Sequence, residues 1–169
     1  SCGLRYPLPA EHSFGTRCPI CMGDTRLSLS RNLIHEPRPE RPVAYQHQQY
    51  AFLLDNIRSA WNVGSIFRTA DGLGFGHAYL CGITPTPDNE AVTKTALGAE
   101  DSVSWSYHKD AVRLAKGLKK EGWRILGLEE TEQAQELTDF HPSASEVNTL
   151  LIAGNEISGI DPGLLELCE

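Results

Sequence analysis

Short apolar runs alternate along the chain with segments whose apolar residues recur at helical spacing. The apolar runs predict strands over residues 50–54, 77–81, 102–107, 123–128 and 149–154. The amphipathic segments predict helices over residues 62–72, 90–97 and 110–121, and a last helix from Pro162 to Cys168. The run 149–154 is almost wholly apolar, as is typical of parallel strands that are buried on both faces. This alternation predicts an α/β fold with a mainly parallel sheet and flanking helices.

The helix over 62–72 is expected to begin at Asn62. The side chain of an asparagine there can accept a hydrogen bond from a free backbone N–H of the first turn. The side of this helix that faces the core is expected to carry Ile66, Ala70 and Leu73.

The first part of the chain has a different character. Residues 1–31 are rich in Gly, Pro, Cys and Arg, and residues 36–42 read Glu-Pro-Arg-Pro-Glu-Arg-Pro. Three prolines in seven residues cannot continue a helix or a central strand. The sequence therefore predicts a small N-terminal segment over 1–35, a stiff linker over 36–42 and an α/β domain over 43–169.

Charge is spread unevenly over a net value of −7. Residues 1–42 carry a net charge of +2, from six arginines and four acidic residues, whereas residues 43–169 carry −9. An acidic domain argues against strong non-specific binding of nucleic acid, since that affinity comes from neutralising phosphates. The arginines of the first segment are either a basic patch or a solvated loop.

Neither a membrane span nor a signal peptide is apparent. No run of about 18 apolar residues occurs, and the first residues contain no apolar stretch of the kind that signal peptides have. The default expectation is a soluble, cytoplasmic protein.

Polar residues follow the first predicted strand and continue into the helix after it, over residues 55–71. Ligands of open α/β sheets bind beyond the carboxyl ends of the strands. Asn62, Ser65 and Arg68 recur at every third position, which places them on one drifting side of the helix. An arginine that faces a cleft suits a phosphate, because its planar fork donates two parallel hydrogen bonds. The alternative is that Asn62 is only a cap and Arg68 only a surface residue.

A second polar segment follows the strand over 149–154. Its loop reads Gly154-Asn155-Glu156-Ile157-Ser158-Gly159. Glycines allow a positive φ and a close approach of the backbone to a ligand. Glu156 is a carboxylate at the carboxyl end of a strand, where sites gather. The alternative is a tight turn with an exposed acid.

Together the two segments resemble the SpoU/TrmH branch of the SPOUT RNA methyltransferases. The first fits that family's pattern Asn-x5-Asn-x-Gly-x-Ile-x-Arg-x-Ala, the second fits Gly-Asn-Glu-x-x-Gly, and the resemblance covers roughly residues 50–169. It implies transfer of the methyl group of S-adenosylmethionine to a ribose 2′-hydroxyl of tRNA or rRNA. It also implies a SPOUT-type fold with a C-terminal trefoil knot, and a homodimer with its active site at the subunit interface.

The resemblance assigns roles to particular residues. Arg68 matches the catalytic arginine, Asn62 the asparagine that supports it and Glu156 the glutamate of the second motif. The loop that holds the cofactor corresponds to Gly154, Asn155, Glu156 and Gly159. An arginine keeps its proton at accessible pH, with a pKa above about 12. Arg68 is therefore either a base that needs help from a substrate phosphate and from desolvation, or a group that only positions the phosphate while water takes the proton.

The family has a third motif, a Ser-Leu-Asn segment that opens the last helix and completes the knot. The sequence stops at Glu169 without it. Three interpretations stay open: the sequence is a fragment, a tail that carries the motif lies beyond it, or the protein is degenerate. A helix that begins at Pro162 and is cut short favours missing residues. The rival function is a non-catalytic RNA-binding protein on the same fold, without a complete cofactor pocket.

Three of the five cysteines have the spacing of a zinc ribbon. Cys18 and Cys21 form a C-x2-C pair, and Cys2 would belong to a first pair whose other member precedes Ser1 or is replaced by His12. The alternative is three free thiols. Cys81, in a predicted strand, and Cys168, in a predicted helix, are expected to be core residues. The sequence thus predicts a structural zinc site in a segment that helps to hold RNA.

Overall fold

The computed structural model of the protein describes residues 2, 17–28, 30, 49–132, 134–136, 139 and 147–169. Contacts within the chain group it into two compact units, residues 1–39 and 40–169. Most of the N-terminal segment and the whole proline-rich linker lie outside the described residues. The boundary near residue 42 therefore stays a prediction.

The second unit contains a sheet of five parallel strands. The strands are β1 (Tyr50–Asp55), β2 (His77–Cys81), β3 (Ser104–His108), β4 (Arg124–Leu128) and β5 (Thr149–Ala153). Their order is β3-β2-β1-β5-β4, and every neighbouring pair is parallel. The predicted α/β fold with a mainly parallel sheet is confirmed. β1 lies in the middle, and all its residues after Tyr50 are buried.

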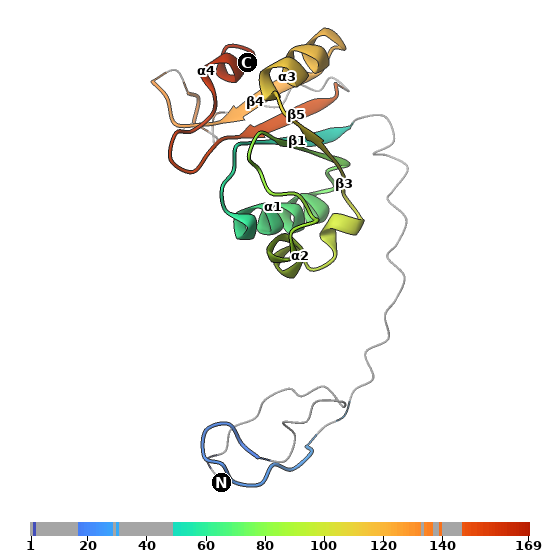
Figure 1. The fold of residues 1–169 in the computed structure, drawn as a ribbon, viewed down its shortest axis with the longest axis vertical. Helices are drawn as coiled ribbons and strands as arrows, with labels where there is room; N and C mark the ends of the chain where they lie inside the picture. The colour runs from blue at the N-terminus through green and yellow to red at the C-terminus, as the bar shows by residue number, and fades with distance from the viewer. Residues whose placement is uncertain are drawn as a thin grey trace. The chain divides into compact units, whose positions relative to one another are not determined.

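Helices cover both faces of the sheet (Figure 1). One face carries α1 (Ala60–Leu73), α2 (Glu90–Ala96) and the short 3-10 helix η2 (Ala99–Asp101), and the other carries α3 (Ala111–Lys120) and α4 (Pro162–Leu165). Successive side chains of a strand point to opposite faces. Phe52 and Leu54 therefore enter the core under α1, while Ala51 and Leu53 enter the core under α3.

The start of α1 differs from the sequence prediction. The N-cap is Ser59, whose side chain accepts a hydrogen bond from the backbone N–H of Asn62 at 3.2 Å. The expectation that Asn62 caps the helix was wrong, because the helix begins two residues earlier and the Asn62 amide is used elsewhere. At the other end Gly74 takes a left-handed conformation with φ of 82° and ends the helix.

The buried side of α1 also differs in part. It consists of Val63, Gly64, Phe67 and Ala70. Ala70 was predicted correctly, Ile66 is half-buried, and Leu73 is 69% exposed. Leu73 was wrongly placed in the core, because at about 100° per residue it lies roughly 60° outside Ala70, which forms one edge of the buried strip.

Gly64 lets α1 and α2 approach closely. A Cβ atom at this position would lie 2.4 Å from the carbonyl oxygen of Val92 and 2.8 Å from the backbone nitrogen of Ala96. Both are backbone atoms of the α2 segment, so they could not move aside without displacing the helix. The glycine of the first motif is therefore explained by helix packing.

The last helix is shorter than predicted. α4 has four residues, and the side chain of Asp161 caps it by accepting a hydrogen bond from the backbone N–H of Gly163 at 2.7 Å. Cys168 lies beyond the helix and is half-buried, so its placement within a helix was wrong. Over the part of the chain that the structure describes, none of the helices combines the length and the apolar character that crossing a membrane requires.

Candidate active site at the carboxyl edge of the sheet

The two polar motifs meet at one point of the sheet. β1 and β5 are neighbours in the middle of the sheet, and the chain leaves β1 toward α1 on one face and β5 toward α4 on the other. A crevice opens where neighbouring strands send their connections to opposite faces, and open α/β sheets bind ligands at such points. We call this point the crevice; the segment after Asp55 and the loop after Ala153 leave the sheet on its two sides.

Glu156 connects the second motif to the first. Its carboxylate accepts hydrogen bonds from the backbone N–H of Arg58 at 2.9 Å, from that of Ser59 at 3.0 Å and from the side-chain amide of Asn62 at 3.0 Å. Backbone N–H groups before the first turn of a helix have no partner within the helix, and the positive end of the helix dipole favours an anion there. Desolvation alone would raise the pKa of Glu156, but these hydrogen bonds outweigh it and lower the pKa to about 2. Glu156 is therefore ionised, and its carboxylate is hydrogen-bonded to the segment that starts α1.

Asn155 fixes the loop itself. Its side-chain amide donates a hydrogen bond to the carbonyl oxygen of Asn56 at 2.6 Å, and its side-chain oxygen accepts from the N–H groups of Ile157 at 2.9 Å and Ser158 at 3.2 Å. Its backbone exchanges two hydrogen bonds with Gly159. The loop is thus closed on itself and attached to the end of β1.

The two glycines of this loop are explained by its geometry. A Cβ at Gly154 would lie 2.2 Å from the carbonyl carbon of Gly159 and 2.3 Å from the nitrogen of Ile160. Gly159 has φ of 72°, and a Cβ there would meet the carboxylate of Glu129 at 2.4 Å. Both positions therefore require glycine for the turn alone, whether or not a ligand approaches.

Three further residues hold the edge, and the sequence did not single them out. Asp55 is only 3% exposed; it accepts hydrogen bonds from the Asn56 amide at 2.7 Å and the backbone of Asp161 at 3.3 Å. Burial, more than its other interactions, raises the pKa of Asp55. The hydroxyl of Thr84, also buried, donates to Leu54 O and accepts from the N–H of Ile57, and Glu129 accepts from the N–H of Ile160. A carboxylate directly after an apolar strand was the one signal that could have identified Asp55.

A polar cavity adjoins the crevice. Its volume is about 280 Å³. Its lining comes from the ends of β1 to β3 and the starts of α3 and α4: Asp55, Asn56, Gly82, Lys109, Asp110, Ala111, Val112 and Asp161. Three carboxylates against one ammonium make it acidic. The cavity therefore suits a small ligand that carries positive charge.

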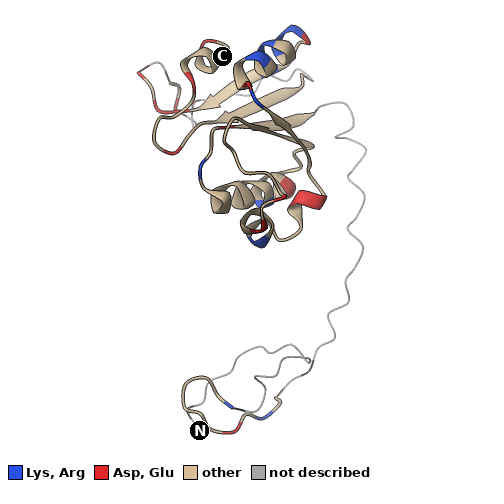
Figure 2. Ribbon diagram, viewed as in Figure 1, with Lys and Arg blue, Asp and Glu red and all other residues tan. Residues whose placement is uncertain are grey.

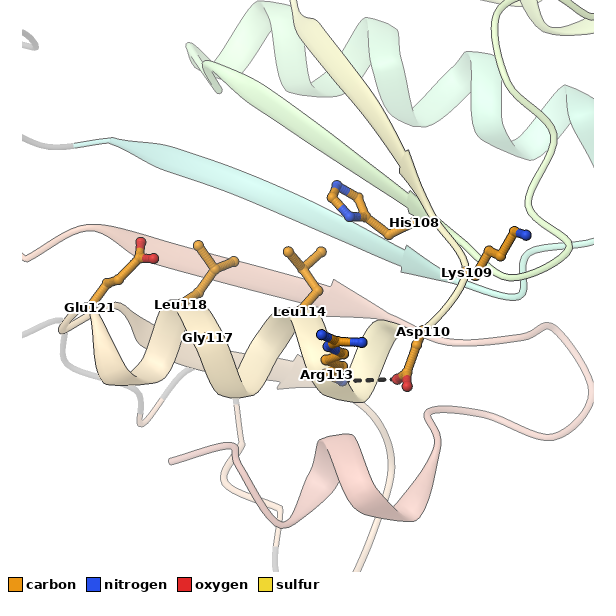
Figure 3. Close-up of a pocket in the computed structure, with 8 residues that line it drawn as sticks. All are labelled: His108, Lys109, Asp110, Arg113, Leu114, Gly117, Leu118 and Glu121. Atoms are coloured by element: carbon orange, nitrogen blue, oxygen red, sulfur yellow. Dashed lines mark hydrogen bonds between the residues drawn. The ribbon is translucent and has the colours of Figure 1, made fainter.

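A larger cavity of about 420 Å³ lies between α3 and the end of β3 (Figure 3). In Figure 3, Lys109, Asp110 and Arg113 gather at the amino end of α3, and Glu121 lies at its other end. None of the residues singled out in the two motifs lines this cavity. Arg113, Lys116, Lys119 and Lys120 lie along α3, and the ribbon of this helix carries several blue positions in Figure 2.

Comparison with known proteins identifies the domain. Residues 49–169 match the family model described as the SpoU rRNA Methylase family. The chain belongs to this family. It is 26% identical over 118 residues to the mitochondrial rRNA methyltransferase 1 of Dictyostelium discoideum, an alignment that covers 69% of this chain and 22% of that protein. The chain spans less than half the length of each of the first curated relatives that it matches.

Solved structures agree with the family. The SpoU methyltransferase AviRb of Streptomyces viridochromogenes, in complex with the cofactor AdoMet, has a TM-score of 0.64 at 21% identity, over 78% of this chain and 53% of that one. The AdoMet-bound rRNA methyltransferase of Sinorhizobium meliloti has a TM-score of 0.63 at 19% identity, over 71% and 44%. These similarities show that the SpoU-family domain has the fold of the TrmH/SpoU methyltransferases, as the resemblance implied. The C-terminal knot and the third motif stay predictions.

Arg68 is not part of the network around Glu156. It lies on the exposed side of α1, six residues beyond Asn62, which is about 9 Å along the helix axis. Among the residues that the structure describes, no hydrogen bond or ion pair joins Arg68 to the second motif. The SpoU-family domain thus brings together Asn62, Asn155 and Glu156 within one chain and leaves Arg68 outside.

The three cysteines of the first unit lie together. The sulfur atoms of Cys2, Cys18 and Cys21 all lie within 4.8 Å of one another, and those of Cys2 and Cys18 are 3.5 Å apart. Hydrogen bonds from the backbone of Gly23 and from Cys2 lower the pKa of Cys21 to about 6. In the second unit, burial instead raises the pKa of Cys81 to about 12, as fits a core thiol. His12, the other ligand considered from the sequence, lies outside the described residues.

Proposed function

We propose that the protein transfers the methyl group of S-adenosylmethionine to a ribose 2′-hydroxyl of tRNA or rRNA. The observation that carries this proposal is the meeting of the two family motifs at the crevice between β1 and β5, through the hydrogen bond between Asn62 and Glu156. Membership of the SpoU family supports RNA as the substrate. The two AdoMet-bound structures that share the fold support the cofactor.

The charge of the residues at the carboxyl edge of the sheet is complementary to that of this cofactor. When bound, S-adenosylmethionine supplies an electrophilic methyl group on a sulfonium, and its free amino group is cationic. The acidic cavity beside the crevice, with Asp55, Asp110 and Asp161, suits such a ligand. The loop of Gly154, Asn155, Glu156 and Gly159 borders this edge from the end of β5. We assign the holding of the cofactor to this edge.

Within this function Glu156 is a positioning residue. A carboxylate with a pKa of about 2 and three hydrogen-bond donors is a poor proton acceptor near neutral pH. Its effect is to keep the start of α1 and the cofactor loop in one fixed relation, together with Asn62. Such positioning matters because methyl transfer needs the hydroxyl oxygen in line with the methyl group.

Arg68 is assigned the catalytic role. Its guanidinium can hold a phosphate next to the target ribose through two parallel hydrogen bonds. This orients the 2′-hydroxyl toward the methyl group, and the proton of that hydroxyl leaves to water, because the guanidinium already carries its own proton. Since Arg68 lies outside the network of its own chain, the site requires RNA or a second subunit to reach it.

We propose that the second subunit is another copy of this chain, so that the two copies form a homodimer with a shared site. Arg68 and Trp61 both lie on the exposed side of α1, and Trp61 is 66% exposed. An exposed tryptophan within the first motif supports a surface that a second subunit covers. Mixing an Arg68→Ala chain with a Glu156→Ala chain then restores part of the activity, because some mixed dimers keep one intact site. No restoration, in a mixture shown to exchange subunits, would overturn the shared site.

Transfer of tritium from labelled S-adenosylmethionine into total tRNA and rRNA tests the function. Arg68→Ala should reduce transfer by about 100-fold or more, as expected for a group that acts in the transition state. The control is Arg124→Ala, because Arg124 begins β4 at the opposite edge of the sheet. Calorimetry with S-adenosylmethionine distinguishes this function from that of a non-catalytic RNA-binding protein, since such a protein gives no heat of cofactor binding. Absence of both transfer and heat would refute the proposal.

A further inference from the structure

The first unit brings three thiols together from two places in the sequence. The backbone N–H of Cys18 donates to Gly23 O at 2.8 Å, and the N–H of Met22 donates back to Cys18 O at 3.0 Å. This closes a tight turn that presents the sulfur atoms of Cys18 and Cys21 on one side. Cys2, sixteen positions before Cys18, reaches the same place. Neither the family nor the domain over 49–169 accounts for this cluster.

The spacing of the sulfur atoms is that of a tetrahedral metal site. With zinc–sulfur bonds of about 2.3 Å, two thiolates on one tetrahedral ion lie about 3.8 Å apart. The observed separations of 3.5 Å between Cys2 and Cys18, and of at most 4.8 Å over all three cysteines, bracket this value. A disulfide needs about 2.05 Å and would leave the third sulfur without a partner. The cluster therefore has the geometry of ligands around an ion.

The described part of the first unit also lacks an apolar core. Of residues 2, 17–28 and 30, only Cys18 is buried. Ile20, Met22 and Leu27 are 72%, 62% and 86% exposed. Small units without a sufficient core hold their fold with disulfides or metal ions. Cys18, the buried residue of this part, is itself a potential ligand. A metal ion bound there would therefore stabilise this part of the chain in the way that an apolar core stabilises other domains.

We propose that Cys2, Cys18 and Cys21 bind one zinc ion as thiolates, with the fourth position of the tetrahedron taken by one further ligand. Three sulfur ligands select a soft or borderline ion and disfavour magnesium and calcium. Each thiol gives its proton to solvent as its sulfur bonds to the ion, and no electron is transferred. The site is structural, because a tight turn and Cys2 hold the three thiolates and the further ligand closes the fourth position of the tetrahedron.

Metal content and thiol protection test the site on the whole chain. The purified protein, loaded with zinc and passed through a desalting column, should hold one zinc per chain by mass spectrometry of the metal. Cys18→Ser should lose at least nine-tenths of it, whereas Cys168→Ser, which removes a half-buried thiol of the other unit, should keep it. With zinc bound, alkylation should spare Cys2, Cys21 and Cys18, and a chelator should expose all three.

Cobalt gives an independent readout. Cobalt(II) in place of zinc should show the intense thiolate charge-transfer and tetrahedral bands, and Cys18→Ser should lose them. Zinc at well below one per chain in the wild type would overturn the site. So would equal loss of zinc in Cys168→Ser and Cys18→Ser, or a disulfide between two of the three cysteines in the protein purified without reductant.

Discussion

The carboxylate of Glu156 should contribute measurably to the stability of the fold, and Glu156→Gln isolates that contribution. The substitution keeps the size of the side chain but removes its charge and replaces one acceptor oxygen with a donor. The pKa of Glu156 falls from an ordinary 4.5 to about 2 in the folded protein, which corresponds to roughly 3 kcal/mol at 1.36 kcal/mol for each pKa unit. Because the side chain is exposed, solvent screening reduces this to about 1 kcal/mol.

The sign of the pH dependence follows from the direction of the shift. A carboxylate whose pKa is depressed in the folded state contributes its stability above the unfolded value of about 4.5, and this contribution disappears as the pH falls toward about 2. The wild type should therefore exceed Glu156→Gln by about 1 kcal/mol in the free energy of unfolding at pH 7. The difference should begin to shrink once the pH falls below about 5.

Urea unfolding between pH 4 and pH 7 measures this difference. Glu130→Gln is the matched control, because Glu130 is an exposed glutamate just past β4 and outside the network. The control should change the free energy of unfolding by no more than about 0.5 kcal/mol. The reasoning would be refuted if Glu156→Gln behaved like the control, or if its deficit stayed the same from pH 7 to pH 4.

Further changes test the packing and the polar contacts around the crevice. Gly64→Ala should cost about 2–4 kcal/mol of unfolding free energy, because the new methyl group meets backbone atoms of α2. Gly72→Ala in the same helix has open space around it and should instead raise the unfolding free energy by up to about 1 kcal/mol, and thermal unfolding compares the two variants. Thr84→Val should lower the free energy of unfolding in urea by about 1–3 kcal/mol, because it leaves Leu54 O and the N–H of Ile57 without their buried hydrogen-bond partner. An equal loss for Thr69→Val, on the exposed side of α1, would contradict this. Asn155→Ala should raise the dissociation constant for S-adenosylmethionine more than tenfold, since the loop loses three hydrogen bonds, and an unchanged value in calorimetry would remove the loop from the cofactor site.

The sequence predicted the sheet well because parallel strands leave a strong local pattern. β2 has the predicted bounds; β1, β4 and β5 differ from theirs by one residue at one end, and β3 differs by two residues at its start and one at its end. The strand order β3-β2-β1-β5-β4 was not predictable in the same way, because it depends on which strands pair over long sequence distances. The pairing of β1 with β5 in that order places the two motifs next to each other.

The polar network was predictable in its members but not in its connections. Asn62, Asn155 and Glu156 were all singled out, yet Asn62 was expected to cap its own helix. Ser59 takes that position. Glu156, which lies 97 residues after Ser59 in the sequence, accepts hydrogen bonds from the backbone N–H groups of Arg58 and Ser59 just before the helix. A capping group so distant in sequence leaves no local pattern. Thr84 and Glu129 escaped notice for the same reason, since each acts on a segment far from it.

The position of the transferred methyl group tests the central claim most directly. RNA labelled by the protein from tritiated S-adenosylmethionine would be digested to nucleosides and separated, with Arg68→Ala and Arg124→Ala treated alongside. The account predicts label in a 2′-O-methylated ribose for the wild type and for Arg124→Ala, and almost none for Arg68→Ala. Label on a base, or equal label from Arg68→Ala and Arg124→Ala, would contradict it.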